Sequence, residues 1–216
     1  MRSLLIATFT IAAFTAYGQA TIPMKFKSED ANKLIKETDS VKYYEATGDM
    51  DDVVTIDEDN AVYKLLGKGR KVIDEGGFVT DDDKYYQDGK WTEHFENGKT
   101  SITGSYRRGK PVGVWKSFYQ EGHIKSIYNY GIILENGIVK TCLSGSYEEF
   151  FPDGKVKVNG YYAAVATDTK DTVTVEDPVT GEKTIAVSAV HSYKGVKTGH
   201  WEYYNEDGEI EKKEDF

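Results

Sequence analysis

The chain has 216 residues with a formal net charge of −9, and aromatic residues make up 13% of it. This charge balance disfavours binding to nucleic acid or to acidic membrane surfaces, because both require dense cationic patches. Twenty-one glycines, only four prolines and the aromatic content favour strands and tight turns and exclude a disordered chain.

The N-terminus has the three parts of a secretory signal. The basic start Met1-Arg2 is followed by an apolar run from Leu4 to Phe14 and by small residues at Ala16 and Gly18. This pattern predicts a signal peptide over residues 1–18. The apolar run is about half of the roughly 20 residues that span a bilayer. We therefore expect an exported protein, periplasmic or extracellular, with no integral membrane segment once the signal is cleaved.

Residues 19–60 differ in composition from the rest of the chain. Ser28 is suited to cap a short helix over 28–37, with acidic residues in its first turn and lysines later. The acidic stretch 49–60 contains Val53, Val54 and Ile56 and fits an edge strand or a linker. We predict an N-terminal helix and linker region over 19–60.

Residues 61–88 are predicted to form a degenerate repeat. Residues 62–66 read as a strand, and 69–78 read as a return strand that ends on Gly76, Gly77 and Phe78. Two tyrosines, Tyr85 and Tyr86, then lead into the first regular unit.

A four-copy repeat runs from residue 89 to 216. Its anchors are Trp91, Trp115, Tyr147 and Trp201. Each anchor has a glycine two residues before it (Gly89, Gly113, Gly145, Gly199) and another seven residues after it (Gly98, Gly122, Gly154, Gly208). A mostly aromatic couple lies between them: His94-Phe95, Phe118-Tyr119, Phe150-Phe151 and Tyr203-Tyr204. Matches at fixed offsets are the signature of a repeat architecture.

Each unit is predicted to be a β-hairpin. The turns read Asn97-Gly98, Asp153-Gly154 and Asp207-Gly208, with Glu121-Gly122 as the weakest copy. Asn-Gly and Asp-Gly favour the two-residue type I′ turn, whose twist matches that of antiparallel strands. Since a single hairpin is marginal in water, the units must stack on their neighbours.

The return strands offer a way to bury the anchors. Gly104 and Gly160 are each followed two residues later by a tyrosine. An aromatic ring stacked over a glycine of the neighbouring strand would bury ring area without crowding. The sequence therefore predicts an all-β fold, an elongated single-layer antiparallel sheet of stacked hairpins.

This pattern carries a resemblance. The succession G-x-W-x-x-[FY]-[FY]-x-x-G, then G-x-Y and the link Gly109-Lys110-Pro111-Val112-Gly113, resembles the MORN-repeat variant family. That family occurs in many bacterial secreted proteins, including some labelled antitoxin components of toxin–antitoxin systems. The resemblance implies an elongated, twisted, single-layer antiparallel sheet and is weak as to function. The Tyr147 copy departs from the pattern, because it lacks the tryptophan.

Two insertions interrupt the array. The longer one, 163–192, holds two β-prone runs around a Pro/Gly turn and is predicted to form a hairpin that projects as an arm. The shorter one, 128–141, contains Asn136-Gly137 and also reads as strand, turn and strand.

No constellation for catalysis or metal binding emerges from the sequence. The four histidines lack zinc-ligand spacing, and His94 stands where other copies have aromatic residues. Acidic runs such as Asp57-Glu58-Asp59, Asp81-Asp82-Asp83 and Glu148-Glu149 read as solvated charge, because adjacent strand residues point to opposite faces. The one cysteine, Cys142, reads as a small apolar strand residue. We expect no cofactor, no metal and no enzymatic activity.

The candidate site is the aromatic strip itself. It comprises Trp91, Phe95, Trp115, Phe118, Tyr119, Tyr147, Phe151, Trp201 and Tyr204. These residues form either the core of the repeats or a surface for a ligand, because a single layer cannot cover both of its faces. The favoured function is an exported protein-interaction module whose protein partner and oligomeric state the sequence does not define. The alternatives are an antitoxin or immunity-like inhibitor and a carbohydrate-binding protein.

Overall fold

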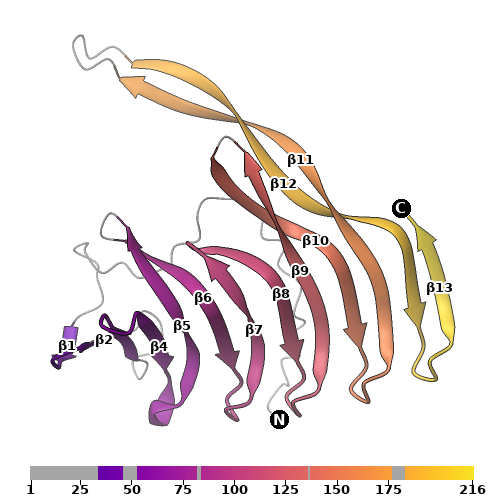
Figure 1. Cartoon of the computed structure of the whole chain (residues 1–216), viewed down its shortest axis with the longest axis horizontal. Helices are drawn as coiled ribbons and strands as arrows, with labels where there is room; N and C mark the ends of the chain where they lie inside the picture. Colours follow the sequence, from indigo (N-terminus) through magenta and orange to yellow (C-terminus); the bar gives the residue numbers. More distant parts are fainter. Residues whose placement is uncertain (1–33, 46–52, 82–83, 136, 177–182) are drawn as a thin grey trace, which may run out of the picture.

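Thirteen strands form one open antiparallel sheet in which every strand pairs with its neighbours in the sequence (Figure 1). The coordinates are a computed structural model that describes residues 34–45, 53–81, 84–135, 137–176 and 183–216. The strands are β1 Leu34–Glu37, β2 Val41–Glu45, β3 Val53–Asp57, β4 Val62–Leu66, β5 Val72–Asp81, β6 Lys84–His94, β7 Thr100–Arg107, β8 Lys110–Phe118, β9 Ile124–Glu135, β10 Ile138–Phe150, β11 Val156–Glu176, β12 Lys183–Tyr204 and β13 Ile210–Asp215. The predicted all-β single-layer sheet is confirmed.

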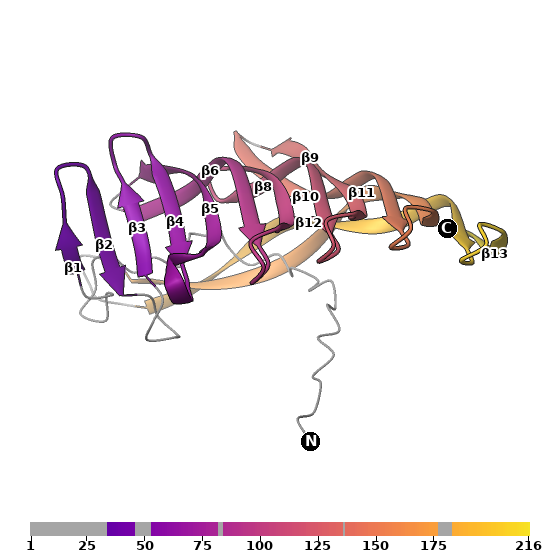
Figure 2. The same ribbon diagram turned by 90° about the horizontal axis from the view of Figure 1, so that it is seen from below.

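Seen at right angles to Figure 1, the strands stand side by side in a row (Figure 2). In the described residues, all strands belong to this sheet, and the one helical element is a 3-10 turn at Lys68–Arg70. No helix in the described part of the chain is long and apolar enough to cross a membrane. The sheet is therefore a single layer, and its side chains must be buried by their neighbours within the same face.

Two sequence-based predictions fail near the N-terminus. Leu34–Glu37 form strand β1 rather than the end of a helix over 28–37, while residues 28–33 lie outside the described residues. Val53–Asp57, predicted as an edge strand or linker, lie inside the sheet between β2 and β4. The prediction missed these strands because their turns lack the glycine spacing of the repeat. The predicted signal peptide, 1–18, also lies outside the described residues.

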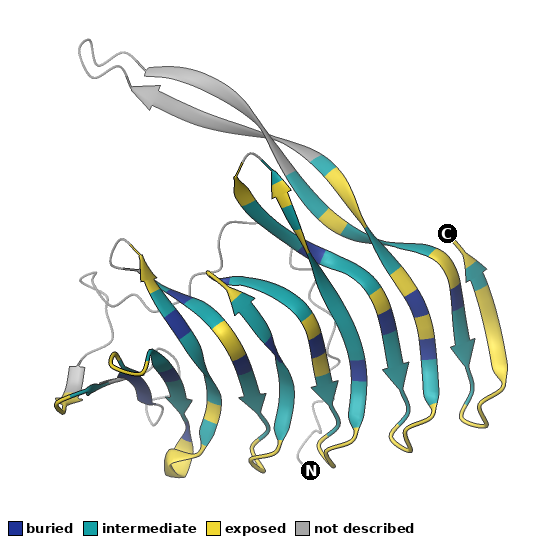
Figure 3. Ribbon diagram, in the orientation of Figure 1, coloured by how far each residue is buried: buried dark blue, intermediate teal, exposed yellow. Residues whose placement is uncertain are grey.

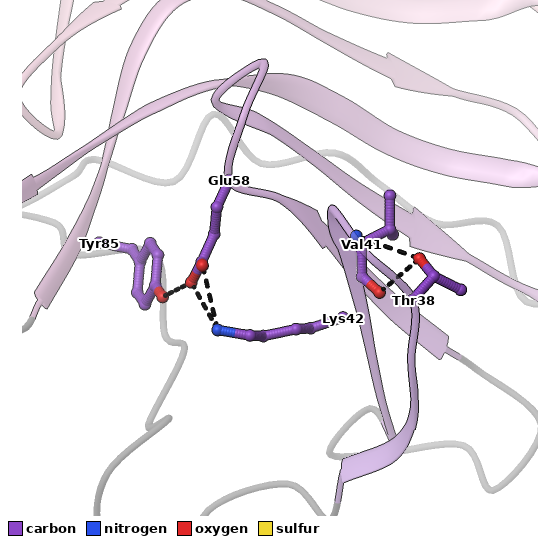
Figure 4. A network of polar contacts seen from close by, with 5 residues as sticks. All are labelled: Thr38, Val41, Lys42, Glu58 and Tyr85. Carbon is purple, nitrogen blue, oxygen red and sulfur yellow. Dashed lines mark hydrogen bonds and ion pairs between the residues drawn. The ribbon is translucent and has the colours of Figure 1, made fainter.

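A polar network ties these first strands to the repeats (Figure 4). Glu58, in the turn after β3, accepts hydrogen bonds from Lys42 Nζ on β2 at 3.0 Å and from the Tyr85 hydroxyl on β6 at 3.1 Å. The bond from Lys42 holds the pKa of Glu58 below its usual value. In the β1–β2 turn, Thr38 Oγ1 accepts from the amide of Val41 at 3.2 Å.

The turns at the anchor end of the sheet differ from the predicted type. The amide of Phe95 donates to Lys99 O at 2.8 Å, and the amide of Gly98 donates to Phe95 O at 2.8 Å. Only the glycine has a positive φ, 81°, whereas type I′ requires a positive φ at Asn97 too. These are three-residue loops closed by a glycine, so the prediction of type I′ turns is wrong.

The turn asparagine has another role. Asn97 Oδ1 accepts a hydrogen bond from the amide of Lys99 at 2.9 Å, and Asp153 Oδ1 accepts one from the amide of Lys155 at 3.0 Å. The side chain thus stabilises the loop, while the backbone of Asn97 and Asp153 stays outside the left-handed region. A two-residue loop with positive φ at both positions does occur at the other end of the sheet, at Arg108 (47°) and Gly109 (76°).

The glycine two residues before each anchor marks a bulge. Between β7 and β8, the register passes from Thr103↔Lys116 to Ser105↔Val112, so β8 advances four residues while β7 advances two. Gly113, inside this bulge, has a φ of 65°. The same shift precedes Trp91, Tyr147 and Trp201. The Gly-x-Trp spacing therefore encodes a local bend of the strand in front of each anchor.

Strands β11 and β12 extend well past the others and form an arm (Figure 1). They stay in register from Tyr161↔Thr198 out to Glu176↔Lys183. At the base of the arm, Gly195 lies against the backbone of Leu143 on β10, where a Cβ would stand 2.5 Å from the Leu143 carbonyl oxygen. The arm thus crosses closely over β10 at this glycine.

Candidate interaction face

The four anchors lie in a row on one face of the sheet, which we call the aromatic face. Trp91 and Trp115 are each 3% exposed, Tyr147 is 7% exposed and Trp201 is 1% exposed. Tyr63 on β4 continues the row, with its ring stacked on Trp91 at a centroid distance of 5.3 Å. Figure 3 shows in dark blue where the strands are buried. The anchors therefore form the core of the sheet.

Each tryptophan lies on a glycine of the preceding strand. A Cβ added to Gly76, Gly104 or Gly160 would collide with the ring of Trp91, Trp115 or Trp201, respectively. The predicted stacking of an aromatic ring over Gly104 and Gly160 is thus present. Gly76 does the same for the first tryptophan, which the sequence analysis missed.

The exceptional copy follows the same rule. Tyr128 occupies the place of the strand glycine before the third anchor, and it pairs directly with Tyr147. A second ring at this place leaves no room for an indole lying flat on the backbone. The missing glycine of β9 and the missing tryptophan of β10 are therefore one coupled change.

Tyrosines fill the spaces between the anchors edge-on. Tyr106 makes T-shaped contacts with Trp91 at 5.8 Å and with Trp115 at 5.0 Å, and Tyr130 makes one with Trp115 at 6.1 Å. Tyr162 does the same between Tyr147 at 5.7 Å and Trp201 at 5.2 Å. Edge-to-face geometry is favourable for aromatic rings.

Unlike the anchors, this tyrosine row is only half-buried. It comprises Tyr106, Tyr128, Tyr130 and Tyr162. Burial raises the pKa of all four hydroxyls. The hydroxyls therefore stay protonated at physiological pH and can both donate and accept hydrogen bonds. The accessible part of the aromatic face is this row rather than the tryptophans.

At the C-terminal end, a lysine covers the last tryptophan. Lys197 Nζ lies 4.2 Å from the ring centroid of Trp201, 5.3 Å from that of Tyr203 and 5.2 Å from that of Phe216. It also donates to the Tyr203 hydroxyl oxygen at 2.7 Å. This ammonium occupies a cage of three rings, a favourable cation–π arrangement.

The remaining predicted strip residues lie near the turns. Phe95, Tyr119 and Phe151 each begin a turn through two backbone hydrogen bonds, and Asn205 takes this place in the last copy. Tyr204 therefore aligns with Phe118, one position earlier, so pairing Tyr203-Tyr204 with the other couples was wrong by one residue. None of these aromatic side chains is fully buried.

A series of contacts connects successive turns, with the donor placed directly after the positive-φ residue of the turn, which is Arg70 in the first case and a glycine in the others. Lys71 Nζ donates to Glu96 O at 3.2 Å, Lys99 Nζ to Glu121 O at 2.7 Å and Lys155 Nζ to Glu206 O at 2.6 Å. His123 Nδ1 makes the corresponding contact with Pro152 O at 2.7 Å. We call these the turn latches.

Tyr63 has the surroundings of an anchor although it precedes residue 89. Arg70, seven residues later, has a φ of 62° and donates its amide to Gly67 O at 2.9 Å, as Gly98 does to Phe95 O. Ala61, two residues before Tyr63, has a φ of 51°. The geometry of the repeat thus recurs here without its glycines.

The acidic runs of the sequence are largely engaged in local contacts. Asp57 accepts hydrogen bonds from Asn60, which hold its pKa low, and Asp81 pairs with Arg108. Glu149 pairs with Lys157 at 2.7 Å. Within the described residues, no group of three or more His, Cys, Asp or Glu side chains is arranged to hold a metal ion. Cys142 is buried in β10.

One acidic pair on the aromatic face was not predicted from the sequence. Asp74 on β5 and Glu93 on β6 are direct cross-strand partners on the aromatic face. Burial raises the pKa of Asp74, and burial together with Asp74 raises that of Glu93 to about 7. No local motif marks this pair, because strand register brings it together.

The fold and this face define a single-layer β-repeat protein built from consecutive hairpins around an internal aromatic row. The model of the MORN repeat variant matches residues 87–108, 111–130, 143–164 and 197–216, each match containing one anchor. The chain belongs to the MORN-repeat variant family, as predicted. No curated protein and no solved structure matches it. MORN repeats are in general protein- and membrane-interaction repeats and are a non-catalytic family.

Proposed function

We propose that the chain is an exported, non-enzymatic module that binds a protein partner through its aromatic face, in the cell envelope or outside the cell. The observation that carries this proposal is the half-buried tyrosine row. In the described residues, all strands belong to one sheet, so no second layer from those residues covers this row. Tyrosine is enriched at protein interfaces, because it combines a large ring with a hydroxyl.

The opposite face supports the choice of side. Its central positions are mostly polar, with Thr92 paired with Thr103, Thr103 with Lys116 and Asn159 with Glu202. Lys116 and Asn159 are exposed. Charged residues are depleted at the centres of protein interfaces, whereas aromatic residues are enriched there.

Site-specific crosslinking in the producing cell tests the proposal. A photoreactive residue would replace Tyr130 on the aromatic face or, as a matched control, Lys116 on the polar face of a neighbouring strand. We expect a discrete adduct with another protein from position 130 and none from position 116. Absence of any adduct from position 130, or the same adducts from both positions, would contradict the proposal.

Export has its own test. The signal pattern over residues 1–18 supports cleavage after Gly18. Mass spectrometry of the protein from fractionated cells should find a chain that begins at Gln19 in the envelope or the medium. A full-length chain confined to the cytoplasm would contradict this part of the proposal.

The other functions gain less from the structure. Carbohydrate binding by aromatic residues needs exposed ring faces, and the three tryptophans are almost fully buried. The antitoxin alternative rests on family labels, and no feature of the sheet favours it. The interaction module is therefore the function that the geometry supports best.

A further inference from the structure

The Asp74–Glu93 pair stands out because one of its carboxylate oxygens is buried without a hydrogen-bond partner. Asp74 Oδ1 is buried and forms no hydrogen bond, and the same is true of the neighbouring His94 Nδ1. In the described part of the chain, neither carboxylate forms an ion pair with a lysine or an arginine. The side chains of Trp91 and His94 both act to lower the pKa of Asp74, but burial outweighs them and raises it. Buried acceptors of this kind normally have a partner.

The repeat itself shows what is missing. Glu93 lies two residues after its anchor Trp91, as Glu149 lies two residues after Tyr147. Glu149 accepts a hydrogen bond from Lys157 Nζ at 2.7 Å. Lys157 is the extra residue of a bulge, because the register passes from Glu149↔Val158 to Phe150↔Val156. The bulge places this lysine beside the carboxylate.

The equivalent bulge beside Glu93 holds a serine. The register there passes from Glu93↔Ile102 to His94↔Thr100, which makes Ser101 the extra residue. The bulge between β8 and β9 holds Lys125, but that lysine lies over the ring of Tyr119 at 5.9 Å. On β8, moreover, Ser117 stands two residues after Trp115, where β6 and β10 have a glutamate. Glu93 is thus the carboxylate of the array that lacks the ammonium its counterpart has.

A second ammonium on the same face strengthens the comparison. Lys197 lies over Trp201, Tyr203 and Phe216 at the C-terminal end. Lys157 thus lies beside a carboxylate, and Lys197 lies over aromatic rings. Asp74 and Glu93 offer a cation both of these contacts, since the two carboxylates lie beside the stacked rings of Tyr63 and Trp91. Aromatic rings and carboxylates together favour a lysine or arginine side chain.

We propose that Asp74 and Glu93 receive a lysine or arginine side chain from an extended segment of the protein partner. This inference rests on the proposed function and names the chemistry of the partner. The cation takes the place that Lys157 has beside Glu149, and its aliphatic stem lies along the neighbouring rings. Negative charge on the face and positive charge on the segment are complementary.

Synthetic peptides provide the direct test. The probe is the labelled peptide Thr-Val-Arg-Val-Thr, whose β-branched residues favour an extended chain, and its control has glutamine in place of arginine. Binding to the mature protein is measured by fluorescence anisotropy at pH 8, where Glu93 is ionised. We expect the arginine peptide to bind at least ten times more tightly than the glutamine peptide. Equal affinities would overturn the proposal.

Three variants locate the binding. Glu93→Gln should weaken binding of the arginine peptide at least tenfold, whereas Glu148→Gln, which changes a carboxylate of the opposite face, should leave it unchanged. Ser101→Lys supplies the missing ammonium from within the chain, so it should also abolish binding while Glu93 is retained. An unchanged affinity in Glu93→Gln and Ser101→Lys would place the peptide elsewhere and overturn the proposal.

The result is separable from the proposed function. If the chain crosslinks to a partner through position 130 and Glu93→Gln leaves both that adduct and peptide binding intact, the acidic site is wrong and the interaction face stands. If the wild-type chain is a dimer and Glu93→Gln is a monomer, the site binds a second copy, and the inference of a foreign partner is overturned.

Discussion

At the scale of single residues, the aromatic core depends on what lies beneath each ring. Gly76, Gly104 and Gly160 are found where a tryptophan follows on the next strand. Tyr128 takes the same place before Tyr147, and Glu214 takes it on β13, after which the structure has no further strand. Glycine is therefore present where an indole must approach the backbone, which is a use of its missing side chain rather than of its flexibility.

Truncating an anchor should be costly. Trp115→Ala removes a ring that is 3% exposed and leaves a cavity above Gly104. We expect a loss of about 3–5 kcal/mol in the free energy of unfolding, as for other buried aromatic residues. The matched control is Val114→Ala, because Val114 is the adjacent residue and is 56% exposed. Chemical denaturation checks both, and equal losses would place the ring of Trp115 at the surface.

Glu93 should make stability depend on pH in an unusual direction. Its pKa is about 7 in the folded chain and about 4.3 when unfolded. The folded state therefore binds the proton more tightly, so the stabilisation is complete below about pH 4.3 and is lost as the pH rises through 7. Glu93→Gln removes this dependence. Urea denaturation at pH 5.5 and 8.0 should show the variant gaining stability relative to wild type at pH 8.0, and parallel pH profiles would contradict the shift.

At the scale of elements, the hairpins follow from local sequence and their bends do not. The Asn-Gly and Asp-Gly signals correctly located the turns, because glycine at that place needs a positive φ whatever the turn type. They predicted the wrong turn type. The side chains of Asn97 and Asp153 accept hydrogen bonds from backbone amides, and the backbone of these two residues does not take the positive φ of a type I′ turn. The bulges at Gly113 and its equivalents depend on register with the preceding strand, which a single strand does not specify.

The coupling of strand glycine and anchor can be tested by transplanting it into the third copy. Tyr147→Trp should cost about 1–3 kcal/mol, because the larger ring meets Tyr128. In a Tyr128→Gly background, the same substitution should cost less by about 1 kcal/mol or more. A double-mutant cycle measures the difference. Costs that add within about 0.5 kcal/mol would show that the two positions are independent.

The turn latches should contribute modestly to stability. Lys99→Met keeps most of the aliphatic stem and removes the bond from Nζ to Glu121 O. We expect a loss of about 0.5–1 kcal/mol, in the range of a single exposed hydrogen bond. Lys116→Met on the exposed polar face serves as control and should change the midpoint of thermal unfolding much less. Equal shifts in the two variants would exclude a stabilising role for the latch.

The candidate site illustrates a second limit of sequence reasoning. The tryptophan anchors could be found because they recur at fixed spacing, but the same spacing fits a core and a binding strip equally well. Only the edge-to-face tyrosines and the strand glycines decide that the tryptophans are internal. Asp74 and Glu93 could not be recognised, because each looks like ordinary surface charge until strand register places them side by side.

At the scale of the whole molecule, the described sheet is open, and β13 pairs with β12 on one side only. Strand β13 carries Glu211, Lys212, Lys213, Glu214 and Asp215, and charged side chains on an edge strand discourage pairing with other chains. Phe216 exchanges two backbone hydrogen bonds with Gly199, at 3.1 and 3.2 Å, and its ring is one of the three around Lys197.

The central claim is that thirteen strands lie in one open layer and that the anchors are buried within it. Small-angle X-ray scattering of residues 19–216 tests this most directly. A compact globular chain of this length has a radius of gyration of about 16–17 Å. An open single-layer sheet with a projecting arm predicts a clearly larger value and the distance distribution of an elongated, flat particle. A radius of about 16–17 Å with a symmetric distribution would contradict the account.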